Sequence, residues 1–259
     1  MITIKYSDNI HNYNYNSFEE ILKIDNYDDI IDINCSWINL SVLPNLPNSL
    51  IRLCCHNNNL SSLPELPNSL TYIDCANNNL SSLSKLPNSL KKLWCGNNNL
   101  SVLPELPNSL TELWCYNNNL SSLPKLPNSL NKLWCGSNRL SCLPELSNSL
   151  THLWCYNNNL SVLPELPNSL TELLYYNNNI SSLANLSNLS CSIFYWGNPI
   201  HTNIEQYFDG VLKNYFEYQN EMKSKFVNKI GNWFLECKYN PKYLYCRKRL
   251  MKEYEELYG

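Results

Sequence analysis

The 259-residue chain has no surplus of positive charge, no long apolar run and only 6 glycines. The net charge of −3 and the pI near 5.8 exclude a general electrostatic attraction to nucleic acid or to an anionic membrane. No run of about 18 consecutive apolar residues occurs, so the sequence predicts no membrane span. We therefore expect neither nucleic acid nor a lipid bilayer among the partners of this chain.

The N-terminal residues, MITIKYSDNIHNYNYNSF, lack the basic flank and the apolar stretch of a secretory signal peptide. We therefore expect an intracellular protein that is not secreted through a signal peptide. In that compartment the repeated Asn-Leu-Ser triplets carry no sugar, although each is formally a glycosylation acceptor. The 12 cysteines need not form disulfides either, because cytosolic thiols stay reduced.

A 20-residue repeat dominates the sequence and aligns without a gap from about residue 30 to residue 180. Each row follows the pattern L-x-x-L-x-C-x-x-N-x-L, as in LTELWCYNNNL at 110–120. The remainder of a row, such as SSLPELPNS, holds two prolines, which do not fit inside an α-helix. The pattern predicts one short strand per row and a return path without a helix.

This motif resembles the leucine-rich repeat, whose sixth position accepts cysteine as a small apolar residue. Rows with Leu-Pro-x-Leu-Pro resemble the short repeats of secreted bacterial effector proteins. The Asn-, Ile-, Tyr- and Lys-rich background resembles leucine-rich-repeat proteins of mimivirus-type giant DNA viruses. The resemblance implies a leucine-rich-repeat solenoid with short parallel β-strands on the concave face and an extended or polyproline-like convex side.

The end of the repeat divides the chain into three predicted parts. Residues 30–200 form the solenoid of about nine repeats. Residues 1–29 form a small N-terminal cap, in which the capping-box pattern at 17–20, Ser-Phe-Glu-Glu, opens a short helix. Residues 201–259 carry helical patterns and form either a helical C-terminal cap or a small interaction domain.

Alternation along each strand decides which side chains face the core. In the row at 110–120 we expect a strand at residues 112–114. Leu113 and Cys115 then point into the solenoid, whereas Trp114 and Tyr116 point to the concave face. The cysteine column is therefore predicted to consist of small buried core residues.

Three consecutive asparagines follow the strand in most rows. The middle asparagine of the three varies least from row to row. In the row LNKLWCGSNRL only that middle residue, Asn138, is kept. We expect this residue to turn the chain and its side-chain amide to bond the backbone of the next row. The structural asparagine ladder consists of Asn58, Asn78, Asn98, Asn118, Asn138, Asn158, Asn178 and Asn198.

Charges alternate in sign between many successive rows at two positions. On the concave face the column consists of Lys92, Glu112, Lys132, His152 and Glu172. On the convex loops it consists of Glu65, Lys85, Glu105, Lys125, Glu145 and Glu165. A lysine then has a glutamate in the rows on both sides and can form an ion pair across the strands. Each such exposed pair contributes at most ~1 kcal/mol. We expect the charges to neutralise one another, with Glu112 pairing with both neighbouring lysines.

The concave face keeps an aromatic strip. It consists of Trp94, Trp114, Trp134 and Trp154, flanked by Tyr116, Tyr156 and Tyr176. Tryptophan and tyrosine are enriched at binding hot spots, and a contiguous apolar patch indicates an interaction site. With Glu112, Lys132 and His152 this strip is the candidate binding site. The alternative is that the rings stack on one another to stabilise the sheet, with glycine rows leaving room for tilted rings.

No catalytic residue, metal site or cofactor is predicted. Cys54 and Cys55 lie on opposite faces, which argues against a shared metal, and Cys237 and Cys246 lie outside the usual zinc spacing. Some bacterial effectors with such repeats carry a cysteine-dependent ubiquitin ligase. Here the segment after position 200 is much shorter than that catalytic domain, and no histidine lies beyond His201, so we do not transfer that activity.

The sequence therefore predicts a non-enzymatic protein–protein interaction module that binds an unknown protein partner through the concave strip. The viral resemblance implies a partner that is a host protein, and a location in the host cytoplasm or in the virion. The oligomeric state stays open. Two alternatives remain: a glycan-binding repeat protein, whose rings stack on sugars, and a substrate adaptor in ubiquitination.

Overall fold

The computed structural model describes residues 1–7, 11–182, 192–201, 221 and 224–225. The chain divides into two compact units, Met1–His201 and Thr202–Gly259. The predicted helical C-terminal part at 201–259 lies almost entirely outside the described residues. The first unit contains the rows of the repeat.

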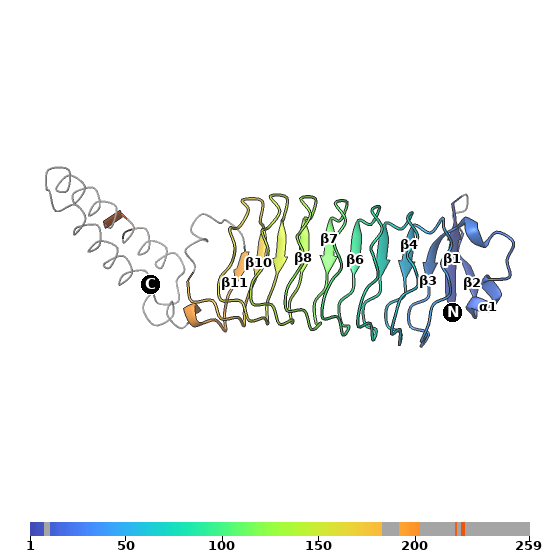
Figure 1. Cartoon of the computed structure of the whole chain (residues 1–259), viewed down its shortest axis with the longest axis horizontal. Coiled ribbons are helices and arrows are strands. Elements are labelled where there is room, and N and C mark those ends of the chain that lie inside the picture. The colour runs from blue at the N-terminus through green and yellow to red at the C-terminus, as the bar shows by residue number, and fades with distance from the viewer. Residues whose placement is uncertain (8–10, 183–191, 202–220, 222–223, 226–259) are drawn as a thin grey trace. The chain divides into compact units, whose positions relative to one another are not determined.

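Each row of the first unit contributes one strand to a single sheet (Figure 1). The strands that pair in parallel after the first row are β4 (Arg52–Cys54), β5 (Tyr72–Asp74), β6 (Lys92–Trp94), β7 (Glu112–Trp114), β8 (Lys132–Trp134), β9 (His152–Trp154), β10 (Glu172–Leu174) and β11 (Ser192–Phe194). Equivalent residues of successive rows pair with one another, so that Leu113 stands beside Leu93 and Leu133. The predicted strand at residues 112–114 is confirmed.

The sheet continues toward the N-terminus with antiparallel strands. β3 (Ile30–Asn34) pairs in parallel with β4 and in antiparallel with β1 (Ile2–Tyr6). β1 in turn pairs with β2 (Tyr13–Tyr15), which forms the sheet edge. The sequence did not predict β1 and β2, because the first residues carry no repeat that fixes a register.

A short helix and a 3-10 turn connect β2 to β3. They are α1 (Phe18–Ile21) and η1 (Tyr27–Asp29). The expected helix after Ser17 is present, but the Ser17 side chain makes no capping hydrogen bond. Instead the backbone N–H of Asn16 donates to Glu20 Oε2 at 2.9 Å. The Glu20 carboxylate therefore accepts from the residue before Ser17, whereas the capping-box pattern predicts that it accepts from the N–H of Ser17 itself.

Columns of leucine and cysteine fill the interior of the solenoid. In the row at 110–120 Leu110, Leu113, Cys115 and Leu120 are fully buried. The buried thiols of the column are Cys35, Cys55, Cys75, Cys95, Cys115, Cys135 and Cys155, all free. The prediction that this column lies inside is confirmed. A row buries these side chains only against its neighbours, so stability comes from stacking.

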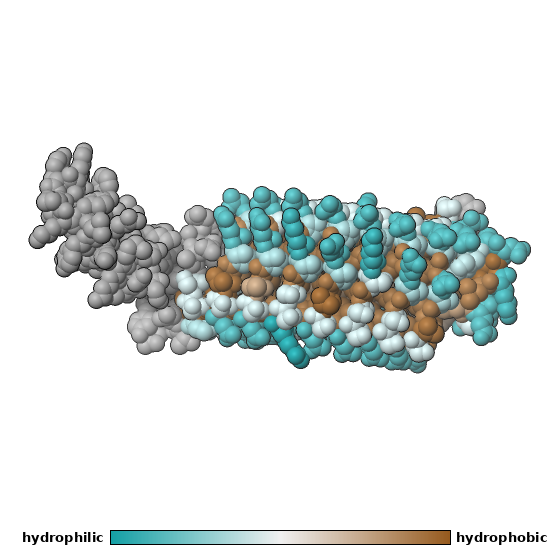
Figure 2. Space-filling model, in the orientation of Figure 1, coloured by the Kyte–Doolittle hydropathy of each residue, from teal (hydrophilic) through white to brown (hydrophobic). Residues whose placement is uncertain are grey.

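The return path of each row contains no helix in the described rows, as the prolines predicted. We call this surface, formed by segments such as residues 101–109, the proline side. The backbone N–H of Leu110 donates to Pro107 O at 3.0 Å and closes a turn there. Ser109 Oγ lies 2.6 Å from Leu90 O of the preceding row, and equivalent serines repeat this contact. Figure 2 shows hydrophilic side chains repeating row by row beside an apolar band.

Candidate functional site: the outer face of the sheet

The first and third residues of each short strand point away from the core. In β6 to β10 these residues are half-buried, whereas the middle residue is buried. We call this surface the outer face of the sheet; it carries the residues assigned above to the concave face.

The tryptophans of β6 to β9 contact one another along the outer face. Trp94 and Trp114 stack with ring centroids 4.0 Å apart and an interplanar angle of 2°. Trp134 then turns edge-on, at 89° to Trp114 and 79° to Trp154. All four rings are half-buried. The rings therefore stabilise one another, as the second interpretation expected, and they leave a strip that is only partly open to solvent.

Two of these indoles bury their polar edge without a partner. Nε1 of Trp94 and of Trp154 has no hydrogen-bond acceptor among the described residues. A buried N–H without a partner costs about 1–3 kcal/mol. The rings of Trp94 and Trp154 are thus held by packing rather than by hydrogen bonds of their indole N–H groups.

Tyrosines of alternate rows lie over glycines of the preceding rows. A Cβ on Gly96 would come within 2.5 Å of the Tyr116 ring, and one on Gly136 within 2.7 Å of the Tyr156 ring. Tyr156 also stacks on Tyr176, with centroids 4.8 Å apart and an angle of 4°. Burial raises the pKa of both Tyr116 and Tyr156. The expectation that glycine rows make room for rings is confirmed.

The charges of the outer face are paired. Glu112 Oε1 lies 3.1 Å from Lys92 Nζ and 3.9 Å from Lys132 Nζ. His152 Nε2 lies 3.7 Å from Glu172 Oε2, an ion pair when the imidazole is protonated. The predicted pairing of Glu112 with lysines on both sides is confirmed, so that one carboxylate lies between two ammonium groups.

A cavity of about 210 Å³ opens where Trp134 turns edge-on. Its lining consists mainly of Trp114, Trp134, Trp154, Lys132, His152 and Glu172. The cavity therefore joins three aromatic walls to a rim of charged groups on β8, β9 and β10. The sequence placed these residues on one face but gave no sign of a hollow between them.

The asparagine ladder bonds the backbone of two rows. Asn118 Nδ2 donates to Cys95 O at 3.0 Å and to Cys115 O at 3.2 Å. Its Oδ1 accepts from the backbone N–H of Leu100 at 2.9 Å. The row reached is the preceding one, not the next one as expected. The turn itself is made by the residue before it, since Asn117 has a φ of +51°.

A polar cluster occupies the outer face at β4 and β5, where the tryptophan column stops. His56 Nδ1 lies 2.9 Å from Asp74 Oδ2 and 3.1 Å from Ser36 Oγ. Burial raises the pKa of Asp74, while the contact with His56 acts in the opposite direction. Because both partners share Nδ1, the imidazole cannot relay a proton from the serine to the carboxylate as in a nucleophilic triad. Asp74 in place of tryptophan was the sequence signal for this cluster.

Aromatic residues beyond the predicted strip are more exposed than those within it. Trp37 is 72% exposed and has a φ of +64°, at the position that Asn57 holds one row later. Trp196 is 44% exposed and stacks on Tyr176 at 4.4 Å. The sequence reasoning missed both because they lie outside the tryptophan column.

Metal and membrane features are absent from the part of the chain that the structure describes. No group of three or more His, Cys, Asp or Glu side chains there could hold a metal ion. No described helix is both long and apolar enough to cross a bilayer.

Solved structures of bacterial effector proteins are similar to the chain over 64–74% of its length. YopM, a leucine-rich effector from Yersinia pestis, is 42% identical with a TM-score of 0.60, covering 64% of this chain and 49% of that chain. YopM from Yersinia enterocolitica is 36% identical with a TM-score of 0.57, covering 64% and 42%. A Shigella effector LRR domain is 31% identical with a TM-score of 0.57, covering 74% and 78%. No protein-family model matches the chain, and neither does any curated protein.

The coverage differs between these proteins. The chain spans less than half the length of the two Yersinia structures, but more than three quarters of the Shigella domain.

Proposed function

Because the chain belongs to the leucine-rich-repeat proteins, we propose that it is a non-enzymatic module that binds a protein partner through the outer face of its sheet. Solenoids of this kind expose extended surfaces that are used for binding. The observation that carries the proposal is the aromatic cavity beside Trp134.

The size and lining of this cavity suit one side chain of a protein. Small-molecule sites usually measure about 300–1,000 Å³, so a hollow of about 210 Å³ is too small for a typical cofactor. Binding hot spots are buried anchors in well-packed pockets surrounded by a polar rim. Trp134 and Trp154 supply the apolar walls, while Lys132, His152 and Glu172 supply the rim.

Glycan binding through the same strip has less support. A sugar ring stacks on an open aromatic face, but Trp94 and Trp114 cover each other's faces at an angle of 2°. Tyr156 and Tyr176 do the same at 4°. A protein side chain that enters beside the edge-on Trp134 needs none of these faces.

The proposed setting is an infected cell, with the partner a host protein. Support comes from the similarity to effector proteins of Yersinia and Shigella. The Asn-, Ile-, Tyr- and Lys-rich composition, which resembles giant-virus repeat proteins, is a second and independent argument.

Affinity capture with a matched pair of lysine variants tests the binding site. Lys92 and Lys132 are 42% and 43% exposed and both pair with Glu112, but only Lys132 lines the cavity. We expect Lys132→Met and Trp154→Leu to lower recovery of a specific host protein at least about 10-fold, whereas Lys92→Met leaves it unchanged. A hot-spot loss of about 2 kcal/mol is sufficient for this effect. Equal recovery with all three variants contradicts the site.

A further inference from the structure

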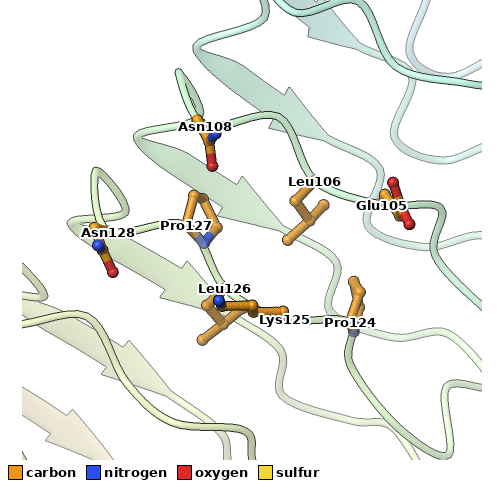
Figure 3. A pocket seen from close by; sticks show the side chains of 8 residues that line it. All are labelled: Glu105, Leu106, Asn108, Pro124, Lys125, Leu126, Pro127 and Asn128. Carbon is orange, nitrogen blue, oxygen red and sulfur yellow. The ribbon is translucent and has the colours of Figure 1, made fainter.

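Two equivalent grooves lie on the proline side, away from the outer face of the sheet. One has a volume of about 630 Å³ and is lined mainly by Glu105, Leu106, Pro124, Lys125, Leu126 and Asn128 (Figure 3). The other, of about 550 Å³, is lined by residues 40 positions earlier: Glu65, Leu66, Ser84, Lys85, Leu86 and Asn88. Each groove therefore lies between a glutamate row and the following lysine row, and the pair repeats every two rows.

The charges that border these grooves are not used within the chain. In the described part of the molecule Glu65, Lys85, Glu105 and Lys125 make no ion pair, in contrast to the lysines and glutamates of the outer face. Figure 3 shows the Lys125 side chain pointing away from Glu105. The expectation that the convex charges neutralise one another is wrong here, since these exposed side chains extend from loops into solvent. Each groove keeps one carboxylate and one ammonium group for a ligand.

Amide groups at the end of each groove are also unused. The side chains of Asn108 and Asn128 are exposed and make no hydrogen bond within the described residues. Their backbone oxygens are engaged: Asn108 O accepts from Ser129 Oγ and Asn128 O accepts from Ser147 Oγ, each at 2.7 Å. A primary amide offers both donors and an acceptor, which suits a peptide backbone with no internal hydrogen bonds.

The floor of the groove in Figure 3 is apolar. Leu126 and Pro127 are buried, and Leu106 and Pro124 are half-buried at its walls. An apolar or proline side chain can therefore enter between the two charged groups. The groove combines a small apolar socket with one acidic, one basic and two amide side chains.

The spacing of the grooves selects the conformation of the ligand. Two rows of parallel strands at ~4.8 Å separate equivalent points of the sheet by ~9.6 Å, and we take the same row spacing for the grooves. A polyproline II helix repeats its face every three residues, or ~9.3 Å. An α-helix repeats its face every ~5.4 Å and a β-strand about every 6.6 Å. Neither repeat matches the ~9.6 Å spacing of the grooves. From this match we propose that the proline side binds an extended polyproline II peptide of the class P-x-x-P. Prolines enter successive grooves, and mixed charges between them pair with the glutamates and lysines.

Fluorescence anisotropy with the full chain tests this proposal. The probe is a labelled peptide of four Pro-Lys-Glu triplets, and its control has glycine in place of each proline. We expect the proline peptide to bind at least about 10-fold more tightly, because its conformation is preorganised. A proline peptide with one glycine inserted after each of the first three triplets lengthens every proline-to-proline step by ~3.1 Å, and we expect the same loss.

A matched pair of double variants locates the site. Glu65→Lys with Glu105→Lys removes the acidic group of both grooves and is expected to weaken binding at least about 10-fold. Glu145→Lys with Glu165→Lys makes the same charge change in the same exposed column but touches neither groove lining, and is expected to retain binding.

Three results overturn the proposal. Equal binding of the proline and glycine peptides excludes polyproline recognition. Equal weakening by both double variants shows that net charge alone attracts the peptide. Self-association in sedimentation that the groove variants abolish and the control pair keeps identifies a second copy of the chain as the occupant.

Discussion

Tyr116 lies across Gly96 of the preceding row, so close that a Cβ on the glycine would stand 2.5 Å from the ring. The same relationship recurs two rows later between Tyr156 and Gly136. Rows with glycine and rows with tyrosine therefore fit each other as pairs. This contact gives a physical reason for the alternation of two kinds of row along the solenoid.

Gly96→Ala is expected to destabilise the chain by about 1–3 kcal/mol, because the added methyl group overlaps the Tyr116 ring. Urea unfolding of the variant measures this loss. Replacing Tyr116 by glycine in the same chain should remove most of it, since Ala76 is naturally followed by Gly96 in the adjacent row. A loss that persists in the double variant contradicts the steric explanation.

Asn118→Ala is expected to lower the free energy of unfolding by roughly 3 kcal/mol. The change leaves Leu100 N–H and two cysteine carbonyl groups without their side-chain partner in a buried setting. Asn119→Ala, one residue later in the same triple, is the control and should cost less than about 0.5 kcal/mol. Comparable losses in urea unfolding would show that the ladder position has no special role.

Glu112→Gln is expected to cost less than about 1 kcal/mol, because the two lysines that it pairs with are more than 40% exposed. The difference from the unchanged chain should shrink as salt is raised from about 0.01 M to 1 M, since the Debye length falls from about 30 Å to 3 Å. A loss independent of salt, measured by urea unfolding across that range, rules out an electrostatic origin.

Alkaline pH is expected to destabilise the fold through the cysteine column. Burial raises the pKa of Cys155 to about 12, above that of a thiol in the unfolded chain, near 8.5. The stabilisation by the neutral buried thiol is complete below the unfolded pKa and is lost as pH rises toward the folded pKa. Between these values each such thiol lowers the free energy of unfolding by about 1.4 kcal/mol per pH unit.

Unfolding free energies at pH 8, 9 and 10 in reductant measure this dependence. Cys155→Ala removes one titrating group and should make the slope shallower by that amount. An unchanged slope in the variant would mean that Cys155 ionises equally in both states.

The register of the sheet could be predicted because stacked rows place equal residues in equal environments. One repeated leucine and one repeated cysteine fixed the inward face, and the outward position of Glu112 between two lysines followed from that. The ring geometry could not be predicted. The segment Lys-Leu-Trp-Cys-Gly is identical at 92–96 and 132–136, yet Trp94 stacks flat on its neighbour and Trp134 stands edge-on. The packing angle of each ring therefore depends on the neighbouring rows and not on the local sequence alone.

The direction of the asparagine bonds was wrong for a related reason. In a parallel array the preceding and the following row lie at the same distance, so the sequence does not distinguish them. The left-handed turn at Asn117 orients the next side chain, Asn118, toward the preceding row. β1 and β2 were missed because a strand outside the repeat has no column with which to align.

Lysine-directed crosslinking of the unmodified chain in the native cell, read by mass spectrometry, tests the central claim most directly. Natural lysines mark both surfaces: Lys92 and Lys132 on the outer face, Lys85 and Lys125 on the proline side. Binding through the outer face predicts that a protein partner is linked to Lys92 or Lys132. A principal partner that is linked only to Lys85 and Lys125 contradicts it.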